Sequence, residues 1–419
     1  MINIKQKNKC MGCSACSQVC PQDCIKMEPD EEGFLYPVVD KEKCINCGSC
    51  DNVCPIMKTK FVPREGFPDA WLIYDSEIAS RKRSAAGGGF SALAREFVFK
   101  NNGVVFGASY DENFYVHHCH AESIEEIKKL QKSKYVQSDI NNTYIQVRTY
   151  LRQNRYVLYS GTPCQIYGLK SFLGVLSKSQ YLYCVDLSCH GVPSPKLFKE
   201  YLSCLEEMEG SQLTSFTMRG KRFKNNSYDQ GFDIMFANGK RQFNSHSQDM
   251  FGRCFWGEIA SRPSCYNCHF KTIWRASDIT LGDCWFFNSY VPKEHDTYGV
   301  TLALAHSKKG RKLIENSELL ISYSVPAEQL IKANGGMIYS SAVPNEKRTE
   351  FFAKLGSIPF NQLVDDMVPA KQSGKKQKIL KVLDTLGIRL EFLRNKSRNR
   401  KLQIRLKAEI PIKARGEMI

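Results

Sequence analysis

The sequence lacks the features that would place the chain in a membrane or on an export route. No run of 18 apolar residues occurs among its 419 residues, so we expect no membrane-spanning helix. Its opening stretch, MINIKQKNKC, contains no apolar core of the kind found in signal peptides. Apart from two paired cysteine runs there is no internal repeat, and no helix-turn-helix pattern is present. We therefore expect a cytoplasmic protein of two or three domains.

Cysteine, by contrast, is abundant, with 18 residues in the chain. In a small secreted domain such a number would indicate disulfide bonds, but this chain is long and carries no export signal. In a reducing cytoplasm, cysteines at short and regular spacings typically bind metal. The cysteine spacing is therefore the first guide to function.

Positive charge is in excess and is concentrated at one end of the chain. The formal net charge is +16. Residues 1–60 hold eight Lys or Arg and eight Asp or Glu, whereas residues 371–419 hold 15 and four. A basic tail of this kind is typical of a solvated, partly helical extension. Contact with an anionic membrane, an acidic partner or nucleic acid is the alternative.

Two cysteine runs near the start of the chain share one pattern. CMGCSACSQVCP and CINCGSCDNVCP both match C-x2-C-x2-C-x3-C-P. In this pattern three closely spaced thiolates bind three irons of one [4Fe–4S] cluster, and the fourth cysteine ligates the other cluster. Gly12 and Gly48 lie within the loops, where the backbone must approach sulfide closely. The predicted ligand sets are Cys10, Cys13, Cys16 and Cys54 for one cluster and Cys44, Cys47, Cys50 and Cys20 for the other.

Zinc sites and disulfide bonds are the alternatives for these runs. Zinc favours paired C-x-x-C motifs, whereas here a triplet with a trailing Cys-Pro occurs twice, so both alternatives are disfavoured. Cys24 lies outside the pattern and is interpreted as a spare buried thiol. Two coupled clusters pass electrons one at a time, so we predict an electron-transfer function.

The chain divides into four parts by composition and pattern. Residues 1–60 are predicted to form a small bacterial-type dicluster ferredoxin domain. FVPREGFPD (61–69), with two prolines and a glycine, is predicted to be a linker. Residues 70–340 alternate strand-like and helix-like segments, which predicts an α/β domain with a mixed, mostly parallel sheet in a chain that is α+β overall. Residues 341–419 are predicted to be a helical, basic C-terminal extension.

Local patterns mark the elements of the α/β region. Asn238-Gly239 between two apolar runs predicts a hairpin, and hence an antiparallel insertion around residues 213–243. Capping residues and prolines mark the helix starts, which we expect at Gly89, Ser123, Pro195 and Lys308. The expected strands are residues 71–75, 104–110, 155–160, 181–188 and 299–307.

Four further cysteines lie beside turn signals. Cys164 in SGTPCQ and Cys189 in DLSCHG each follow a predicted strand, and Cys265 and Cys268 form the C-x-x-C of RPSCYNCHF. The carboxyl ends of parallel strands meet at one edge of a sheet, where sites form. Four thiolates meeting there would hold a third cluster. From spacing alone, scattered structural cysteines are equally compatible.

Several segments between residues 84 and 285 carry a resemblance to a known family. They are SAAGGGF (84–90), KSKYVQSD (132–139), YSGTPCQIYGLK (159–170), DLSCHGVPSP (186–195) and RPSCYNCHF with RASDITLGDCW (262–285). In this order they resemble the coenzyme F420 hydrogenase/dehydrogenase beta-subunit family of iron–sulfur flavoproteins. The resemblance covers about residues 70–310, with the dicluster domain added in front. Ala85 and Ala86 stand where the family more often has serine, so no hydroxyl contact is expected there.

The resemblance implies FAD bound without a Rossmann fingerprint, and no G-x-G-x-x-G follows a strand here. Three glycines before a helix offer backbone N–H groups to a pyrophosphate, although alone they are equally typical of a flexible turn. Lys134 would supply a cation and Tyr135 a stacking ring, although both are also typical of a surface helix end. The residues implied to contact the cofactor are Gly87, Gly88, Gly89, Lys134, Tyr135, Gly161, Thr162, Gln165 and Asp283.

Other polar residues have two open interpretations each. Arg275, Asp278 and Asp283 follow the C-x-x-C pair and either line the flavin cavity or form ion pairs within the fold. His190 either donates a hydrogen bond to a cluster sulfur or has a structural role, which is favoured. For three histidines at alternating strand positions beside a cysteine, a surface strand is favoured over metal. These are His117, His118 and His120, beside Cys119.

The sequence thus predicts a flavin-dependent oxidoreductase, without naming its catalytic residues. A flavin exchanges electrons as hydride and also singly, which joins one-electron clusters to two-electron chemistry. Electrons would run between a one-electron carrier such as ferredoxin, the clusters, FAD and an unidentified small-molecule substrate. The alternative is an electron-transfer subunit that serves a partner enzyme. The deazaflavin coenzyme F420 is not expected as a fixed requirement, because members of the family occur where it is not made.

Overall fold

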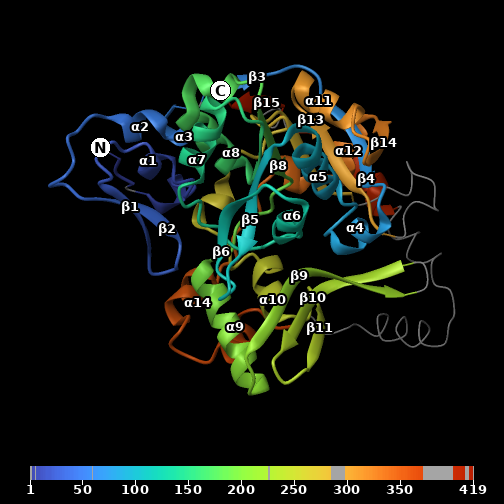
Figure 1. Cartoon of the computed structure of the whole chain (residues 1–419). Coiled ribbons are helices and arrows are strands. Elements are labelled where there is room, and N and C mark those ends of the chain that lie inside the picture. Colours follow the sequence, from blue (N-terminus) through green and yellow to red (C-terminus); the bar gives the residue numbers. More distant parts are fainter. Residues whose placement is uncertain are drawn as a thin grey trace.

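The computed structural model describes residues 2–4, 6–58, 60–224, 227–284, 298–370, 400–410 and 415–418. A small N-terminal unit lies at one end of the molecule, beside a central sheet covered by helices (Figure 1). A smaller antiparallel sheet with its own helices lies at the foot of the view. No helix within the described ranges is long and apolar enough to cross a membrane.

The central sheet has eight strands in the described part of the chain. They are β4 (Asp69–Asp75), β5 (Val104–Tyr110), β6 (Val116–Ala121), β7 (Val157–Gly161), β8 (Leu182–Leu187), β12 (Ile279–Asp283), β13 (Thr301–Ala305) and β14 (Leu320–Val325). Their order is β14-β4-β13-β12-β8-β7-β5-β6. Parallel pairing joins the four central strands β12, β8, β7 and β5, and the remaining neighbours are antiparallel.

Helices cover both faces of this sheet. Alternate residues of a strand point to opposite faces, so Trp71 and Ile73 pack in one layer while Leu72 and Tyr74 pack in the other. The first layer contains α5 (Gly89–Asn101), α6 (Ile124–Leu130) and α11 (Lys308–Glu315). The second contains α7 (Thr143–Arg152), α8 (Pro163–Leu173), α12 (Ala327–Asn334) and α13 (Gly336–Tyr339). Burial on both faces explains the near-continuous apolar runs of the strands.

The N-terminal unit packs firmly against the rest of the molecule. Its elements are a 3-10 turn η1 (Lys7–Lys9), α1 (Ala15–Gln18), β1 (Ile25–Pro29), β2 (Leu35–Val39), α2 (Ser49–Val53) and α3 (Pro55–Lys58). Phe34 is fully buried in a core shared with the smaller sheet. Glu32 forms an ion pair with Arg348, and the Ser171 hydroxyl donates to the Val53 carbonyl at 2.6 Å.

The smaller sheet has the order β11-β10-β9, with all pairs antiparallel. Its strands are β9 (Leu213–Lys224), β10 (Ser227–Phe236) and β11 (Arg241–Ser245). It packs with α9 (Pro195–Glu209), α10 (Met250–Trp256), α14 (Arg348–Lys354) and α15 (Phe360–Met367). Asn238 and Gly239 form the turn between β10 and β11, where Gly239 has a φ of +83°.

The predicted mixed α/β architecture and its antiparallel insertion are confirmed. Parallel pairing is less extensive than "mostly parallel" implies, because a short turn makes β6 antiparallel to β5, and β13 runs antiparallel to both of its neighbours. Within the predicted linker, β3 (Phe61–Pro63) pairs with β15 (Gly416–Met418). The predicted basic extension is described only in part, since residues 371–399 lie outside the described ranges.

Candidate functional site

A cavity of about 280 Å³ opens where the carboxyl ends of the central strands face the smaller sheet. The ends of β7, β8 and β12 contribute to its wall, as expected for a ligand site in a sheet with parallel strands. Its volume is close to the lower limit of about 300 Å³ that is typical of small-molecule sites. Among the residues predicted to contact FAD, those that line it are Gly88, Gly89, Lys134, Tyr135, Gly161, Thr162, Gln165 and Asp283.

The glycine segment borders the cavity, but two of its N–H groups already have an acceptor. Those of Gly87 and Gly89 point to the Thr301 hydroxyl oxygen, at 3.0 and 3.4 Å. A Cβ on Gly87 would lie 2.7 Å from the Thr301 nitrogen, and Gly88 has a φ of +85°. Close packing and the turn therefore require these glycines. What the segment presents to the cavity is the N-terminal turn of α5, the positive end of a helix dipole.

The turn from β7 into α8 is fixed by a hydrogen-bond network. The Thr162 N–H donates to Gln165 Oε1 at 2.8 Å, and Gln165 Nε2 donates to the Ser138 hydroxyl at 3.0 Å. His118 Nδ1 lies 2.9 Å from the same hydroxyl, and its Nε2 lies 3.0 Å from the Ser160 carbonyl. A neutral imidazole with its proton on Nε2 satisfies both contacts. Burial lowers the pKa of His118 to about 4, so the ring stays neutral.

Lys134 and Tyr135 lie at the cavity but are engaged by the protein. The Lys134 ammonium donates to the Lys129 and Gln131 carbonyls at 2.9 and 2.8 Å, at the end of α6. Burial lowers the pKa of Lys134 to about 7. The Tyr135 hydroxyl accepts from Arg219 Nη1 at 2.8 Å, and its ring packs on an aromatic residue of α10. The predicted cation and ring are thus positioned side by side at the cavity wall.

Arg219 of β9 is a cavity residue that the sequence does not single out. Its side chain is buried and pairs with both oxygens of Asp283, at 2.6 and 3.0 Å. Its Nε is buried without a hydrogen-bond partner among the described residues. Two positions further along the strand, the Lys221 ammonium donates to the carbonyls of Arg81, Ala86 and Tyr298, of which Ala86 lines the cavity. No sequence motif marks an arginine such as Arg219 within a strand. The only signal for it was that the carboxylate of Asp283, once buried, needs a positively charged partner.

The four scattered cysteines come together beside the cavity. Cys164 opens α8, Cys189 follows β8 and lines the cavity, and Cys265 and Cys268 lie in or just after a 3-10 turn, η3 (Pro263–Asn267). Burial raises the pKa of all four thiols, and the other three members of the set raise that of Cys164 further. Backbone N–H groups point at these sulfurs, and the Lys271 ammonium acts to lower the pKa of Cys189 and Cys268. This donor set suits an anionic cluster.

The first set of N-terminal cysteines surrounds a hollow of about 30 Å³ that adjoins the third set. The hollow is lined also by Cys164 and Phe270. Burial raises the pKa of Cys13 to about 12, while backbone N–H groups act to lower it. A Cβ on Gly168 of α8 would lie 2.9 Å from the Cβ of Cys13. The cysteines of this set are Cys10, Cys13, Cys16 and Cys54.

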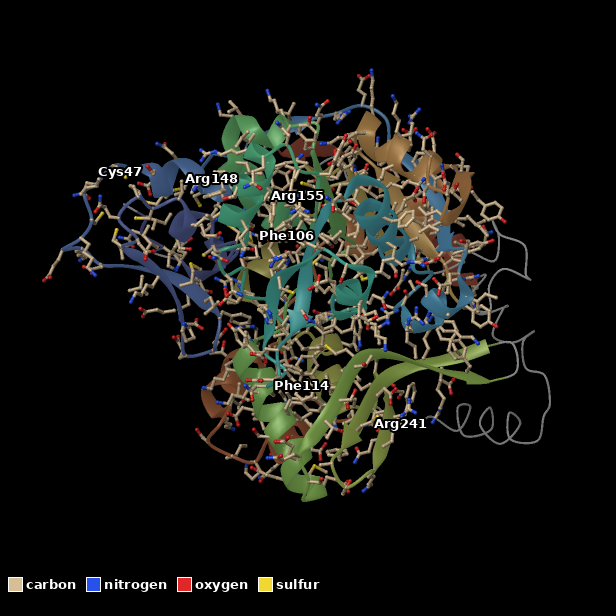
Figure 2. All side chains as sticks on the ribbon, viewed as in Figure 1. Cys47, Phe106, Phe114, Arg148, Arg155 and Arg241 are labelled. Atoms are coloured by element: carbon tan, nitrogen blue, oxygen red, sulfur yellow. The ribbon has the colours of Figure 1, made fainter. Side chains whose placement is uncertain are left out.

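The second set surrounds a hollow of about 20 Å³ at the outer end of the N-terminal unit. Cys47 is exposed and is labelled at that end in Figure 2. Cys24 is buried, with its sulfur 3.3 Å from that of Cys20. Within the described ranges, no three Cys, His, Asp or Glu side chains converge tightly enough to hold a single metal ion. The cysteines of this set are Cys20, Cys44, Cys47 and Cys50.

Comparison with known proteins gives two matches on the sequence. Residues 9–57 match the 4Fe-4S dicluster domain, and residues 154–322 match the family described as the C terminus of the coenzyme F420 hydrogenase/dehydrogenase beta subunit. We call these two matched ranges the dicluster domain and the beta-subunit domain. The matches confirm the resemblance predicted from the motifs.

Several chains of solved structures match this chain, whereas the comparison with curated proteins found no match. One of the matching structures is titled "Xenon derivatization of the F420-reducing [NiFe] hydrogenase complex from Methanosarcina barkeri". The chains are 15% identical, and the match covers 77% of this chain and 94% of that chain with a TM-score of 0.43.

The beta-subunit domain includes most of the site but not all of it. The matched range contains the α8 turn, the third cysteine set and Asp283, whereas the glycine segment and Lys134 precede it. The cavity lies at the carboxyl ends of central strands and borders the N-terminal turn of α5, where a bound anionic group would meet the positive end of the helix. The dicluster domain includes all eight N-terminal cysteines of the two runs.

Three other predicted residues have structural partners. Arg275 and Asp186 form an ion pair at 3.3 Å and are both buried. Asp278 forms an ion pair with Lys309 at 3.5 Å and accepts from the Ser307 hydroxyl at 2.6 Å. Neither Arg275 nor Asp278 lines the cavity, so the ion-pair interpretation applies to both. His190 lines the cavity with its Nε2 2.7 Å from Glu258 Oε1, as expected for a structural histidine.

Proposed function

We propose that the protein is a flavin-dependent iron–sulfur oxidoreductase. FAD binds in the cavity, where it supplies hydride transfer and also accepts or donates single electrons. The clusters of the dicluster domain and a third cluster in the beta-subunit domain connect it to a one-electron carrier such as ferredoxin. The chain's own residues bind, space and tune these groups.

One observation carries this proposal. The first turn of α8 contributes Thr162 and Gln165 to the cavity, while Cys164 between them lines the hollow of the inner dicluster set. Cys189, a second member of the third set, lines the cavity itself. A cluster held by the third set would therefore lie between the flavin and the dicluster domain.

The ligand assignment predicts the metal content. Three sets of four cysteines each hold a four-iron cluster, so anaerobic reconstitution should give about 12 iron per chain. Chemical analysis of iron, sulfide and flavin in the purified protein measures this. A plateau near about eight iron would remove the third cluster and leave the dicluster domain intact.

Electron exchange between flavin and clusters tests the proposed path. Cys268→Ala should retain the electron paramagnetic resonance signals of the dicluster domain. After stopped-flow mixing of this variant with dithionite, its reduced clusters should no longer reduce the flavin rapidly. Cys204→Ala, which removes a buried thiol of α9 outside all three sets, is the matched control. Wild-type electron transfer in the Cys268 variant would overturn the third-cluster assignment.

A hydride donor distinguishes this enzyme from an electron-transfer subunit. Flavin reduction by NADH, NADPH or reduced F420 in the isolated chain would show that the substrate binds here. If none of these donors reduces the flavin while ferredoxin does, the chain is a subunit that passes electrons to a partner enzyme.

A further inference from the structure

Arg262 is among the largest fully buried side chains in the described part of the chain, with a relative exposure of 0%. Its Nε donates to the Cys10 carbonyl at 2.8 Å, and its Nη1 donates to Gln137 Oε1 at 3.0 Å. The guanidinium lies over the Tyr36 ring, 4.0 Å from the centroid. Its Nη2 is buried without a hydrogen-bond partner among the described residues. One arginine of the body is thus inserted into the dicluster domain.

No carboxylate pairs with this guanidinium among the residues that the structure describes. Two other buried arginines do have such partners, Arg219 with Asp283 and Arg275 with Asp186. A guanidinium does not lose its proton in proteins, and an isolated buried charge is strongly unfavourable. Negative charge close to Arg262 must therefore come from another source.

Arg262 contacts the loops of two thiol sets. On one side, a Cβ on Gly12, in the loop after Cys10, would lie only 3.0 Å from its Nη1. On the other side, the Cys265 N–H donates to the Arg262 carbonyl at 2.9 Å. The guanidinium bonds the Cys10 loop directly and lies one side-chain length from the turn that carries Cys265. One positive charge is therefore close to the loops of both the inner dicluster set and the third set.

We propose that Arg262 is the shared counter-cation of two clusters, the one at the Cys10 set and the one at the Cys164 set. This inference rests on the proposed function, because it requires that both sets hold clusters. A cubane with four thiolate ligands is anionic, and one-electron reduction adds one negative charge without making or breaking a bond. Since charges interact strongly in a dry interior, the buried guanidinium stabilises the reduced form.

Two consequences follow for electron transfer. Arg262 raises the reduction potentials of both inner clusters, which makes them better acceptors for electrons that arrive from the outer cluster. It also fixes the Cys10 loop against the segment that carries Gln137, between two cavity residues, Val136 and Ser138. Arg262 is thus a positioning residue, which sets the distance and the potential of clusters that it does not ligate.

Two variants separate the charge of Arg262 from its shape. Arg262→Gln removes the charge and keeps an amide for hydrogen bonding, whereas Arg262→Lys keeps the charge and loses the planar fork. Arg348→Gln is the matched control, because Arg348 also joins the body to the N-terminal unit but has its own carboxylate in Glu32. Each protein is reconstituted anaerobically, analysed for iron, and titrated with reductant while the cluster signals are followed by electron paramagnetic resonance.

We expect the potentials of both inner clusters in Arg262→Gln to move negative by at least about 59 mV. That is a tenfold change in a one-electron reduction equilibrium. Arg262→Lys should return them toward the wild-type values, and Arg348→Gln should leave them unchanged.

The possible results are distinguishable. Unchanged potentials in a fully loaded Arg262→Gln protein overturn the inference and leave the proposed clusters in place. If Arg262→Gln loses iron while Arg262→Lys keeps its iron and the wild-type potentials, the clusters need the positive charge of Arg262 and the inference is supported. If both variants lose iron, the shape of the guanidinium is what the site requires, and the counter-cation role is rejected. If the iron content of the reconstituted wild-type protein stops at about eight per chain, the third cluster is absent and Arg262 cannot serve two clusters.

Discussion

The carboxylate of Asp283 neutralises a buried guanidinium inside the cavity. Arg219 is 5% exposed, and its two terminal nitrogens reach the two oxygens of Asp283. Asp283→Asn leaves this charge buried without compensation, so we expect the free energy of unfolding to fall by about 3–5 kcal/mol. Urea unfolding under anaerobic conditions, at equal iron content, measures the change.

A second arginine–aspartate pair on the smaller sheet is the control for this prediction. Arg241 donates to both oxygens of Asp233 at 2.7 and 2.6 Å, but its side chain is 62% exposed. Asp233→Asn should therefore cost less than about 1 kcal/mol. Equal losses in the two variants would show that burial does not set the strength of the cavity pair.

His118 should make stability depend on pH. Burial lowers its pKa to about 4 in the folded protein, whereas an unfolded histidine has a pKa near about 6.5. Between these values the unfolded chain binds a proton that the folded chain does not, so stability falls as the pH drops from about 6.5 to about 4. The full loss is about 3 kcal/mol.

The thermal unfolding midpoint measured at pH 7 and pH 5 tests this dependence. His118→Gln should show a smaller decrease between the two pH values than the wild type, whatever its stability at pH 7. His120→Gln, on an exposed position of the same strand, should retain the wild-type decrease. An unchanged pH dependence in the His118 variant would contradict the assigned cause.

Of the two residues in the cavity pair, Asp283 could be predicted from the sequence and Arg219 could not. Asp283 was found because it stands in a motif, RASDITLGDCW. Arg219 lies 64 residues earlier in a strand, and its role depends on how the smaller sheet packs over the cavity. The same holds for Arg262, which stands in a motif but whose contact with Cys10 spans 252 residues. Motifs identify residue types, whereas long-range partners depend on the fold.

At the scale of elements, α8 lies between the cavity and the inner dicluster set. A Cβ on Gly168 would lie 2.9 Å from the Cβ of Cys13, 3.0 Å from its sulfur and 3.1 Å from the Tyr144 hydroxyl oxygen. Gly168→Ala should push the helix away from the Cys13 loop, because contacts this short force the neighbouring atoms to move. We expect lower iron retention at the inner set and slower electron transfer to the flavin.

Iron content after gel filtration and stopped-flow flavin reduction measure these two effects. Gly336→Ala at the start of α13 is the control, because its Cβ would meet only the Ser340 hydroxyl oxygen, at 3.3 Å. Gly168→Ala with full iron content and a wild-type rate would show that the contact between α8 and the Cys13 loop can relax without consequence.

Elements with local signals were predicted well. The capping box of Ser123 and Glu126 opens α6, Ser194-Pro195 opens α9, and Asn238-Gly239 closes the hairpin of β10 and β11. The direction of the outer strands was not predictable in this way. β13 is a buried apolar run like the parallel strand β7, and only its place between β12 and β4 makes both of its pairings antiparallel.

At the scale of the molecule, the dicluster domain and the rest of the chain share a hydrophobic core. Phe34 and Tyr36 belong to the same core as Phe198 and Phe251 of the body. Composition and spacing could not predict this contact, because aromatic residues after a ferredoxin run are equally suited to the core of a free-standing domain.

The three cysteine sets follow one another from the exposed end of the N-terminal unit to the cavity. Cys47 of the outer set is exposed, the inner set adjoins Cys164, and Cys189 of the third set lines the cavity. A protein carrier would approach the clusters at the exposed end of the outer set, where Cys47 is labelled in Figure 2. We therefore expect electrons from ferredoxin to pass through the outer and then the inner set before they reach the flavin.

Removing one ligand from each N-terminal set tests this order. Cys47→Ala and Cys54→Ala should each lose about four iron, the first from the outer and the second from the inner set, because the Cys54 ligand crosses over. Both should retain FAD with unchanged affinity, since the cavity is lined by neither set, and both should lose flavin reduction by ferredoxin. A Cys54 variant that still reduces its flavin at the wild-type rate would show that electrons bypass the inner set. Loss of FAD together with the inner cluster would show that the cavity depends on the dicluster domain for its shape. The shared core around Phe34 would be the physical link between the two.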